Sequence, residues 1–308
     1  MRRAFLLIML ATFAAGIGWW LLRPLPQHLT VRLTQLHSPR PWQSVAAPPA
    51  TAPATPAATP IATPAATPLT TSSTKPTPSA TAAASGGELA LIVDDCGQWI
   101  ETERRFVALD IPLTLSVLPD VPYSGEIARE AAAAGKGIML HLPMEALSGI
   151  DPGRGKVTTA MSDGAIVAAV QADLAQVPLA QGVNNHEGSK ASADPRVMHA
   201  VIGVLAQRGN LFFIDSRTNA ASVGESTARD LGVPTAARDV FLDNRPNVAY
   251  SEAQLLAAAA IAREHGSAIA IGHPKPTTLE ALRAMIPQLQ ASGIRFVLVA
   301  DLVATNGR

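Results

Sequence analysis

Short apolar runs alternate with longer stretches of helical pattern from Glu88 to the end of the chain, and this alternation constrains the fold more than any other feature. The runs cover residues 89–93, 113–118, 137–140, 182–184, 211–214, 240–242, 268–271 and 296–299. Most are apolar throughout, which is typical of strands buried on both faces of a parallel sheet. Around eight β-α units in about 215 residues favour an α/β barrel, with a doubly wound open sheet as the alternative.

The stretches between the runs carry residues that start and stop helices. Asp194 is expected to cap a helix whose first turn holds Pro195 and whose end is marked by Gly209. Two further helices are bracketed by similar pairs, Ser251 with Gly266 and Thr278 with Gly293. Charged and apolar residues at helical spacing predict another helix over residues 99–108, packed against the barrel.

Composition argues against several classes of protein. No glycine-rich phosphate loop follows the first run, which disfavours a nucleotide-binding version of the fold. The formal net charge is zero, 16% of residues are charged and no basic run occurs, so nucleic acid is not expected as a partner. The single cysteine, Cys96, rules out an intrachain disulfide. It is interpreted as a packed residue, because the neighbouring aspartates disfavour its thiolate.

The first residues of the chain predict a membrane anchor. Arg2 and Arg3 precede an uncharged apolar run over residues 4–22. As a helix this run would span roughly 28 Å, close to the thickness of the hydrocarbon core of a bilayer. The two arginines favour a cytoplasmic N-terminus, and Trp19 and Trp20 stand where an interfacial aromatic belt is expected.

A cleaved signal peptide with a small-residue site near Ala14 is the alternative, and both interpretations predict export of the rest of the chain. Residues 46–86 are almost wholly Ala, Pro, Thr, Ser and Gly. Such a segment cannot bury enough apolar surface to fold, so it is expected to be a disordered, extended tether. In a bacterial host the predicted layout is an anchor or signal segment over 1–24 and a linker over 25–87. A periplasmic domain at the inner membrane follows over 88–308.

Chemically versatile side chains follow several of the predicted strands. In parallel α/β folds such residues collect at the carboxyl ends of the strands. Three of the seven histidines stand at such ends, as do three aspartates: His141, His186, His273, Asp94, Asp95 and Asp215. Imidazoles and carboxylates are therefore expected to converge on one rim of the barrel.

This combination suits a metal ion. Neutral imidazoles and a carboxylate are typical ligands of a zinc-like ion that keeps one position open for water. Adjacent residues that leave a strand point in different directions, so one of Asp94 and Asp95 could bind a cation while the other acts as a base. The alternative is that one of them caps the helix that starts near Gly97.

Five short motifs occur in order along the domain. They are IVDDCG over 92–97, HLPME over 141–145, GVNNHEGS over 182–189, FIDSRT over 213–218 and GHP over 272–274. In this order they resemble the successive motifs of the divergent polysaccharide deacetylase family, a branch of the NodB-like carbohydrate deacetylase superfamily. The likeness covers the chain from about Glu88 to Val303.

The resemblance implies a distorted (β/α) barrel and a divalent metal, with zinc expected, that is held by aspartate and histidine. It also implies action on N-acetyl or O-acetyl groups of a polysaccharide, such as a peptidoglycan-type glycan. Residue by residue, Asp95 matches the metal aspartate, Asp94 the catalytic base and His141 the first metal histidine. His273 matches the histidine that protonates the leaving group.

One ligand position departs from the superfamily pattern. Where the superfamily has a second metal histidine, four residues after the first, this chain has Glu145. His186 is therefore assigned as the third ligand, with Glu145 as the alternative. Two arginines, Arg217 and Arg238, are expected to pair with carboxylates such as Asp215 and Asp239 and so to hold the ligands in place. The alternative is that they form ordinary salt bridges at the rim of the barrel.

These features predict a metal-dependent deacetylase that acts on a cell-envelope glycan. A non-catalytic periplasmic protein that binds a glycan or a protein partner is the alternative. A different metal hydrolase on a similar barrel is a third option, which a panel of esters, amides and phosphoesters would distinguish.

Overall fold

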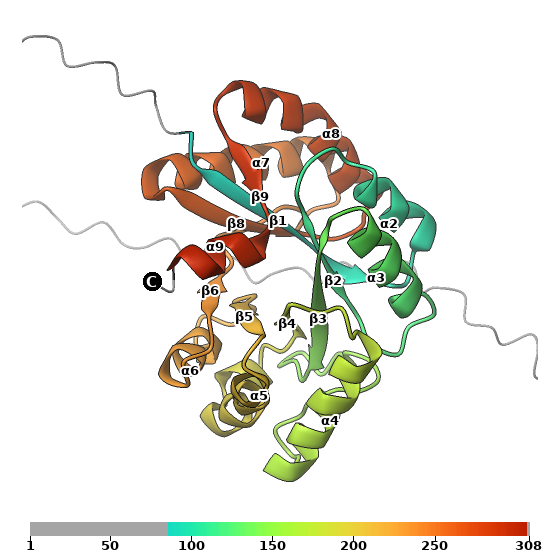
Figure 1. Ribbon diagram of the computed structural model, residues 1–308, viewed down its shortest axis with the longest axis vertical. Helices are drawn as coiled ribbons and strands as arrows, with labels where there is room; N and C mark the ends of the chain where they lie inside the picture. Colours follow the sequence, from blue (N-terminus) through green and yellow to red (C-terminus); the bar gives the residue numbers. More distant parts are fainter. Residues whose placement is uncertain (1–85, 307–308) are drawn as a thin grey trace, which may run out of the picture. The chain divides into compact units, whose positions relative to one another are not determined.

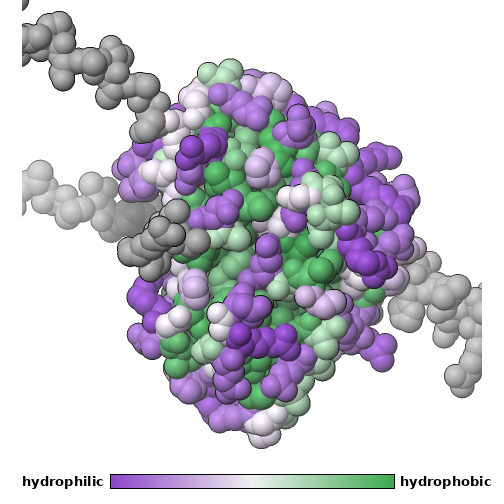
Figure 2. Space-filling view, in the orientation of Figure 1, coloured by the Kyte–Doolittle hydropathy of each residue, from purple (hydrophilic) through white to green (hydrophobic). Residues whose placement is uncertain are grey.

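The computed structural model describes residues 86–306. The predicted anchor or signal segment over 1–24 and nearly all of the predicted linker lie outside these residues. Within them, no helix has both the length and the apolar character needed to cross a membrane. On the face shown in Figure 2, hydrophobic residues gather near the middle and hydrophilic residues dominate the outline.

A parallel sheet of nine strands forms the centre of the described domain (Figure 1). Its strands are β1 (Glu88–Cys96), β2 (Thr114–Val117), β3 (Gly137–Met144), β4 (Gly182–Glu187), β5 (Phe212–Asp215), β6 (Thr235–Ala237), β7 (Val240–Phe241), β8 (Ser267–Gly272) and β9 (Arg295–Val297). The order across the sheet is β6-β5-β4-β3-β2-β1-β8-β7. The first half of β1 pairs with β9 as well as β8, and its second half pairs with β2.

From β1 to β6, strands that are consecutive in the chain are neighbours in the sheet, and β8 lies next to β1, as in a closed barrel. The ring of strands is open at one place. The two strands at its ends, β6 and β7, are consecutive in the chain, yet no hydrogen-bonded pairing joins them in the described domain. The sheet is therefore a half-barrel. The predicted α/β class with a parallel sheet is confirmed.

Helices connect successive strands except β6 and β7, which are joined by Arg238 and Asp239 alone. They are α2 (Ile100–Val107), α3 (Ser124–Ala133), α4 (Asp163–Gln176), η2 (Ala191–Ala193), α5 (Pro195–Arg208), α6 (Gly224–Asp230), α7 (Val248–His265), α8 (Pro276–Ala291) and α9 (Val299–Asn306). Figure 1 shows α2 and α3 beside one another and α7 beside α8, each pair against the sheet. Their apolar faces bury the outer side of the strands.

Alternation along the strands divides the core into two layers. On β1, Leu89 and Leu91 belong to the outer layer beneath the helices, whereas Ala90 and Ile92 belong to a separate inner cluster. Leu302 of α9 is part of that inner cluster. Because successive side chains of a strand point to opposite faces, an apolar run of this kind requires cover on both sides. Here α9 contributes the cover on the inner face.

Helix boundaries agree with the sequence patterns at some ends and differ at others. The Asp194 side chain caps α5 by accepting hydrogen bonds from two backbone N–H groups, and Gly209 follows the helix with φ 70°, as predicted. The start of α7 was predicted at Ser251 and is wrong, since Asn247 caps this helix instead by accepting from the N–H of Tyr250.

Three other elements also differ from the prediction. Helix α8 begins at Pro276, before the predicted cap Thr278, because proline suits the first turn of a helix. The last apolar run was predicted as one strand over 296–299, but β9 ends at Val297 and α9 begins at Val299. Strand β6 was not predicted, since its three half-buried residues form no apolar run.

Candidate functional site

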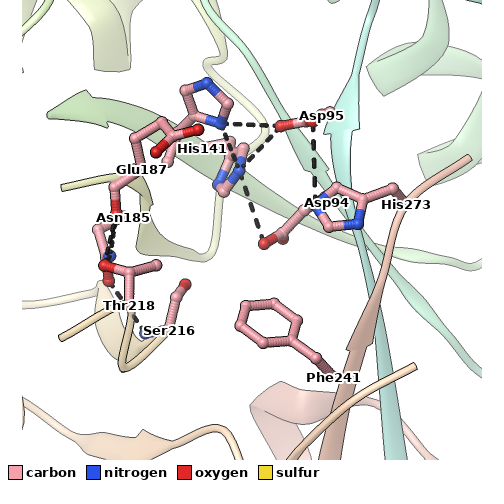
Figure 3. Close-up of a pocket in the computed structure, with 10 residues that line it drawn as sticks. Asp94, Asp95, His141, Asn185, Glu187, Ser216, Thr218, Phe241 and His273 are labelled. Atoms are coloured by element: carbon pink, nitrogen blue, oxygen red, sulfur yellow. Dashed lines mark hydrogen bonds and ion pairs between the residues drawn. The ribbon is translucent and has the colours of Figure 1, made fainter. Parts of the chain in front are cut away.

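Polar side chains gather at the carboxyl ends of the strands, on the inner face of the sheet (Figure 3). There the inner positions continue the alternation of the apolar layer below: Asp94 after Ile92, His141 after Met139, Ser216 after Ile214 and His273 after Ile271. They line a cavity of about 150 Å³ together with Asp95, Asn185, His186, Glu187, Thr218 and Phe241. The structure thus brings five of the six strand-end residues into one pocket, and leaves out Asp215.

Both adjacent aspartates reach this pocket because the backbone of β1 departs from regular geometry. Asp95 has φ 59°, in the left-handed region, and the pairing of β1 with β2 slips between Val93 and Cys96. Regular alternation would send Asp95 to the face opposite Asp94. A left-handed conformation at a residue other than glycine costs about 1 kcal/mol or more, and the surrounding structure must supply it.

The loop after these aspartates is held by Glu103. One of its carboxylate oxygens, Oε1, accepts hydrogen bonds from the N–H groups of Gly97, Gln98 and Trp99, at 3.0, 3.0 and 2.8 Å. Glu103 of α2 therefore satisfies the backbone N–H groups before this helix, and neither aspartate is needed to cap it. Asp94 and Asp95 are left to the pocket.

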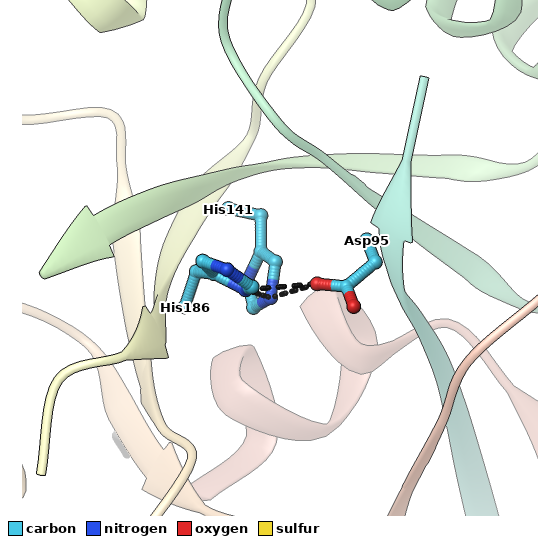
Figure 4. A group of neighbouring side chains, drawn as sticks. All are labelled: Asp95, His141 and His186. Atoms are coloured by element: carbon cyan, nitrogen blue, oxygen red, sulfur yellow. Dashed lines mark hydrogen bonds and ion pairs between the residues drawn. The ribbon is translucent and has the colours of Figure 1, made fainter. Parts of the chain in front are cut away.

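Three donor atoms converge at the centre of the pocket (Figure 4). Asp95 Oδ1 lies 2.8 Å from His186 Nδ1 and 3.3 Å from His141 Nε2, and the two nitrogens are 3.2 Å apart. Asp95 Oδ1 is buried, and neither contact satisfies hydrogen-bond geometry. Ligands of one tetrahedral ion, each at about 2.0–2.1 Å, lie about 3.3 Å from one another. The three side chains therefore fit a single divalent cation.

A buried amide sets the orientation of His141. Asn184 Nδ2 donates to Asp94 Oδ1 at 2.9 Å and to Ser216 Oγ at 3.2 Å, which turns Asn184 Oδ1 towards His141 Nδ1, 2.9 Å away. Because Oδ1 can only accept, His141 carries a proton on Nδ1. Its Nε2 lone pair then faces Asp95 and His186, as expected for a metal-binding histidine.

Asn184 was not predicted as a site residue. It lies two positions before His186 on β4, so strand periodicity alone places it on the same face. Its pairing with His141 follows from the register of β3 against β4, in which the two residues are direct partners. That register cannot be read from the motif.

His273 is held on the opposite side of the pocket by a residue that the sequence analysis missed. Asp243 Oδ1 lies 2.8 Å from His273 Nδ1, and Asp243 Oδ2 accepts from the His273 N–H and from Thr278 Oγ1, each at 2.8 Å. His273 Nε2 consequently faces the pocket, 3.9 Å from Asp95 Oδ2. The available signal was the position of Asp243, directly after the apolar run 240–242.

The two adjacent carboxyl groups have opposite electrostatic environments. Burial raises the pKa of Asp94 above its ordinary value, although His141 and His273 act against it. Burial also opposes ionisation of Asp95, but the imidazoles of His186 and His141 outweigh it and hold its pKa well below the ordinary value. Divergent environments of this kind separate a carboxylate that stays ionised from one that exchanges a proton.

His273 favours its protonated form. Burial opposes the charge on the imidazole, but nearby aspartates, led by Asp243, outweigh burial and raise its pKa to about 9. Phe241 lies against the same imidazole, with the two ring centroids 6.3 Å apart and the planes 17° from parallel. This side of the pocket therefore offers a fixed acid next to an aromatic wall.

Glu145, the alternative third ligand, lies outside the convergent group. Its Oε2 accepts from the N–H and the hydroxyl of Thr159, at 2.8 and 2.7 Å, and its Oε1 pairs with Lys190 Nζ at 2.7 Å. Lys190 and the Thr159 hydrogen bonds lower the pKa of Glu145 to about 2. Glu145 joins the loop after β3 to the loop after β4, so the geometry favours His186.

Of the two expectations for the arginines, the structure favours ordinary contacts at the rim over pairing with Asp215 or Asp239. Arg217 pairs with Glu225 at 2.8 Å, and within residues 86–306 neither Arg217 nor Arg238 forms an ion pair with Asp215 or Asp239. Asp215 accepts from the Arg217 N–H at 2.8 Å and from the Glu225 N–H at 3.1 Å, which fixes the start of α6. Arg238 donates to two backbone carbonyls and covers an aromatic ring of the pocket wall. These arginines support the rim and do not hold the ligands.

Comparison with known proteins identifies the family. Residues 91–303 match the profile of the family described as divergent polysaccharide deacetylase. An uncharacterized protein of Haemophilus influenzae is 36% identical over 202 residues, which cover 66% of this chain and 72% of that protein. The uncharacterized protein YibQ of Escherichia coli is 36% identical over 203 residues, which cover 66% of this chain and 63% of YibQ.

The fold also occurs in a solved structure. The crystal structure of an uncharacterized protein of Agrobacterium tumefaciens superposes with a TM-score of 0.67 at 22% identity. The match covers 72% of this chain and 91% of the other. The profile match over residues 91–303 and the 36% identity to the Haemophilus influenzae protein confirm the resemblance of the five motifs: the chain belongs to the divergent polysaccharide deacetylase family.

Proposed function

We propose that this chain is a metal-dependent hydrolase that removes acetyl groups from a cell-envelope glycan. The observation that carries the proposal is the convergence of Asp95, His141 and His186 on one point. Asp94 and His273 border the same cavity, so a base and an acid lie next to the candidate metal site. Family membership supports the substrate class.

The donor set suits zinc. One carboxylate oxygen and two imidazole nitrogens leave at least one position of a tetrahedral ion open, as in catalytic zinc sites. A divalent ion bound there would polarise the acetyl carbonyl and lower the pKa of water. His141, oriented by Asn184, and His186 would hold the ion together with Asp95.

The remaining residues of the pocket supply proton transfer. Asp94, held by the Asn184 amide, would accept the proton of the attacking water. His273 would donate the proton that the departing amine or alcohol needs, and Asp243 keeps its Nε2 directed at the pocket. The attack breaks the bond between the acetyl carbon and the sugar nitrogen or oxygen, so acetate and the free sugar group are the products.

The size of the cavity agrees with this reaction. Pockets that enclose a drug-sized ligand begin at about 300 Å³. The cavity of about 150 Å³ is smaller, so it suits an acetyl group while the sugar chain remains at its mouth. Phe241 offers an aromatic face on the wall.

The cellular placement is part of the proposal. The apolar run over residues 4–22 and the Ala/Pro/Thr-rich stretch over 46–86 support a domain tethered to the inner membrane and exposed to the periplasm. A peptidoglycan-type glycan would be within reach of such a tether.

Bound metal and acetate release test the proposal directly. We expect one equivalent of divalent metal in the purified full chain by elemental analysis. We also expect acetate release from N-acetylated or O-acetylated glycans that stops when a chelator is added. His186→Ala should abolish both, whereas His199→Ala, a change on α5, should affect neither. Absence of stoichiometric metal together with chelator-insensitive or undetectable release would contradict the proposal.

A non-catalytic role is the second candidate, and one distance favours it. His186 Nδ1 and Asp95 Oδ1 lie 2.8 Å apart, close enough for the two side chains to contact each other directly without an ion between them. In that case the pocket would bind a glycan or a protein without chemistry. Full rescue of a deletion phenotype by Asp94→Asn would favour this role, since the base would then be unnecessary.

A further inference from the structure

Glu187 is an acid of the pocket that the proposed reaction does not use. It is the last residue of β4, is half-buried and lines the cavity next to the three candidate ligands. Figure 3 shows it on the same wall as Asn185 and Thr218. Asp94 and Asp95 both contact imidazoles or an amide, whereas the Glu187 carboxylate has no hydrogen-bond or ion-pair partner within residues 86–306.

The backbone turns this side chain towards the pocket. His186 faces the candidate metal site, so regular alternation would direct the next residue to the other face of the sheet. Glu187 instead has φ 51°, in the left-handed region, as Asp95 does. Its carbonyl accepts from Asn185 Nδ2 at 3.1 Å and from Thr218 Oγ1 at 2.6 Å, which holds the turn. The structure therefore sustains a strained conformation that presents a carboxylate to the cavity.

The other polar groups of this wall already have partners. Asn185 Oδ1 accepts from the Ser216 N–H at 2.9 Å, and the Asn185 amide group donates to the Glu187 carbonyl and to Thr218. The Glu187 carboxylate is not part of the convergent group formed by Asp95, His141 and His186. It is thus an acceptor that the protein leaves for the ligand.

We propose that Glu187 binds an ammonium group of the glycan, so that this chain prefers glycans with a free amino sugar beside the acetylated one. The inference rests on the proposed function. A ligand that covers the carboxylate removes its water, which is unfavourable unless the ligand donates a hydrogen bond. The strongest donor is a cation, and a deacetylated amino sugar carries one. Such a chain would act on material from which another deacetylation has already removed acetate.

Paired binding measurements test this preference independently of turnover. Two oligosaccharides of equal length, one fully N-acetylated and one partly deacetylated, are titrated into the full chain by calorimetry at a pH where the amine is protonated. We expect the partly deacetylated oligosaccharide to bind about tenfold more tightly than the fully acetylated one, and this preference to shrink as salt is added. Glu187→Gln, which keeps the size and an acceptor oxygen, should remove the preference by weakening binding of the partly deacetylated oligosaccharide about tenfold. Glu101→Gln, an exposed change on α2, is the matched control and should keep the preference.

Several results would overturn the inference. Equal binding of the two oligosaccharides by the unaltered chain would do so, as would a preference that persists in Glu187→Gln. Loss of bound metal in Glu187→Gln would show that this residue is a ligand instead. If acetate release is observed without any preference, this inference fails and the proposed function stands. If neither oligosaccharide binds and no acetate is released, both fail.

Discussion

The inner face of the half-barrel has two halves that are built on the same strands and hold different residues. In the half near the amino ends, Ile92, Ile214 and Ile271 pack in an apolar cluster with Leu302 of α9. In the half near the carboxyl ends, the next inward positions carry carboxyl, hydroxyl and imidazole groups. Both halves lie on the same strands, so the change from apolar to polar residues along each strand separates stability from chemistry.

Backbone conformation differs between the same two halves. In residues 86–306, four residues other than glycine have positive φ: Asp95, Asp120, Glu187 and Arg217. Asp95 and Glu187 lie at the carboxyl ends of β1 and β4, and Asp120 and Arg217 lie in the loops that follow β2 and β5. The strain is therefore confined to the half that carries the pocket, where it redirects side chains that regular alternation would turn away.

Substitution of the two aspartates should have the largest effect. Asp95→Asn should lose both the bound metal and the activity, because it removes a candidate ligand. Asp94→Asn should keep the metal and lower kcat about a thousandfold, the range expected for loss of a general base. Elemental analysis and acetate release measured on both variants check the division of roles. Equal metal loss in the two variants would contradict it.

The apolar half should respond in stability and leave the chemistry unchanged. Ile271 is fully buried in the inner cluster, so Ile271→Ala should lower the free energy of unfolding by about 2–5 kcal/mol. The metal content of the folded variant should stay the same. Urea denaturation measures the loss, with Leu256→Ala, which is 52% exposed, as the control with little effect. An unchanged unfolding midpoint for Ile271→Ala would contradict the assignment of stability to the apolar half.

Asp173 is a buried acid outside the pocket, where it affects the stability of the domain and not the chemistry of the site. Asp173 on α4 is 1% exposed, and its Oδ2 has no hydrogen-bond partner in the described domain. Burial, with a contribution from Asp120, raises its pKa from 3.8 to about 7. Because the pKa is higher in the folded than in the unfolded state, ionisation destabilises the fold, and this loss grows as the pH rises from about 4 to about 7.

Asp173→Asn should therefore stabilise the domain, by up to about 4 kcal/mol above pH 7. The gain should be larger at about pH 8 than at about pH 5, since less of the acid is ionised at the lower pH. Thermal unfolding at both values measures it, with the exposed Asp230→Asn as control. A gain that does not depend on pH would show that the ionised form of Asp173 is not the cause.

The buried amide of the pocket should give the smallest effect. Asn184→Ala removes the hydrogen bonds to His141 and Asp94 while it keeps all three candidate ligands. Loss of a partner that orients a ligand typically weakens metal affinity by about 10–100-fold. Competition with a metal-binding dye measures this change. Metal affinity equal to that of the unaltered chain would show that the amide does not orient the site.

Part of the candidate site could be predicted from residues that stand at strand ends. His141, His186 and His273 were placed on one rim because each follows an apolar run, and the pocket contains all three. Asp243 follows such a run as well, but no pattern in the sequence joins it to His273, which lies 30 residues later. The choice between Glu145 and His186 also stayed open, because the direction of the loop after β3 depends on the contacts of Glu145 with Thr159 and Lys190.

The sequence by itself determined the parallel α/β class, the rim on which the polar residues collect and the family. Apolar runs, strand periodicity and motif order are local properties that one chain displays without its neighbours. The tertiary structure alone decided that β6 and β7 do not pair with each other, that Asn184 lies opposite His141 and that Asp95 and Glu187 turn into the pocket. These features depend on strand register and on left-handed residues, and both are set by contacts between segments far apart in the chain.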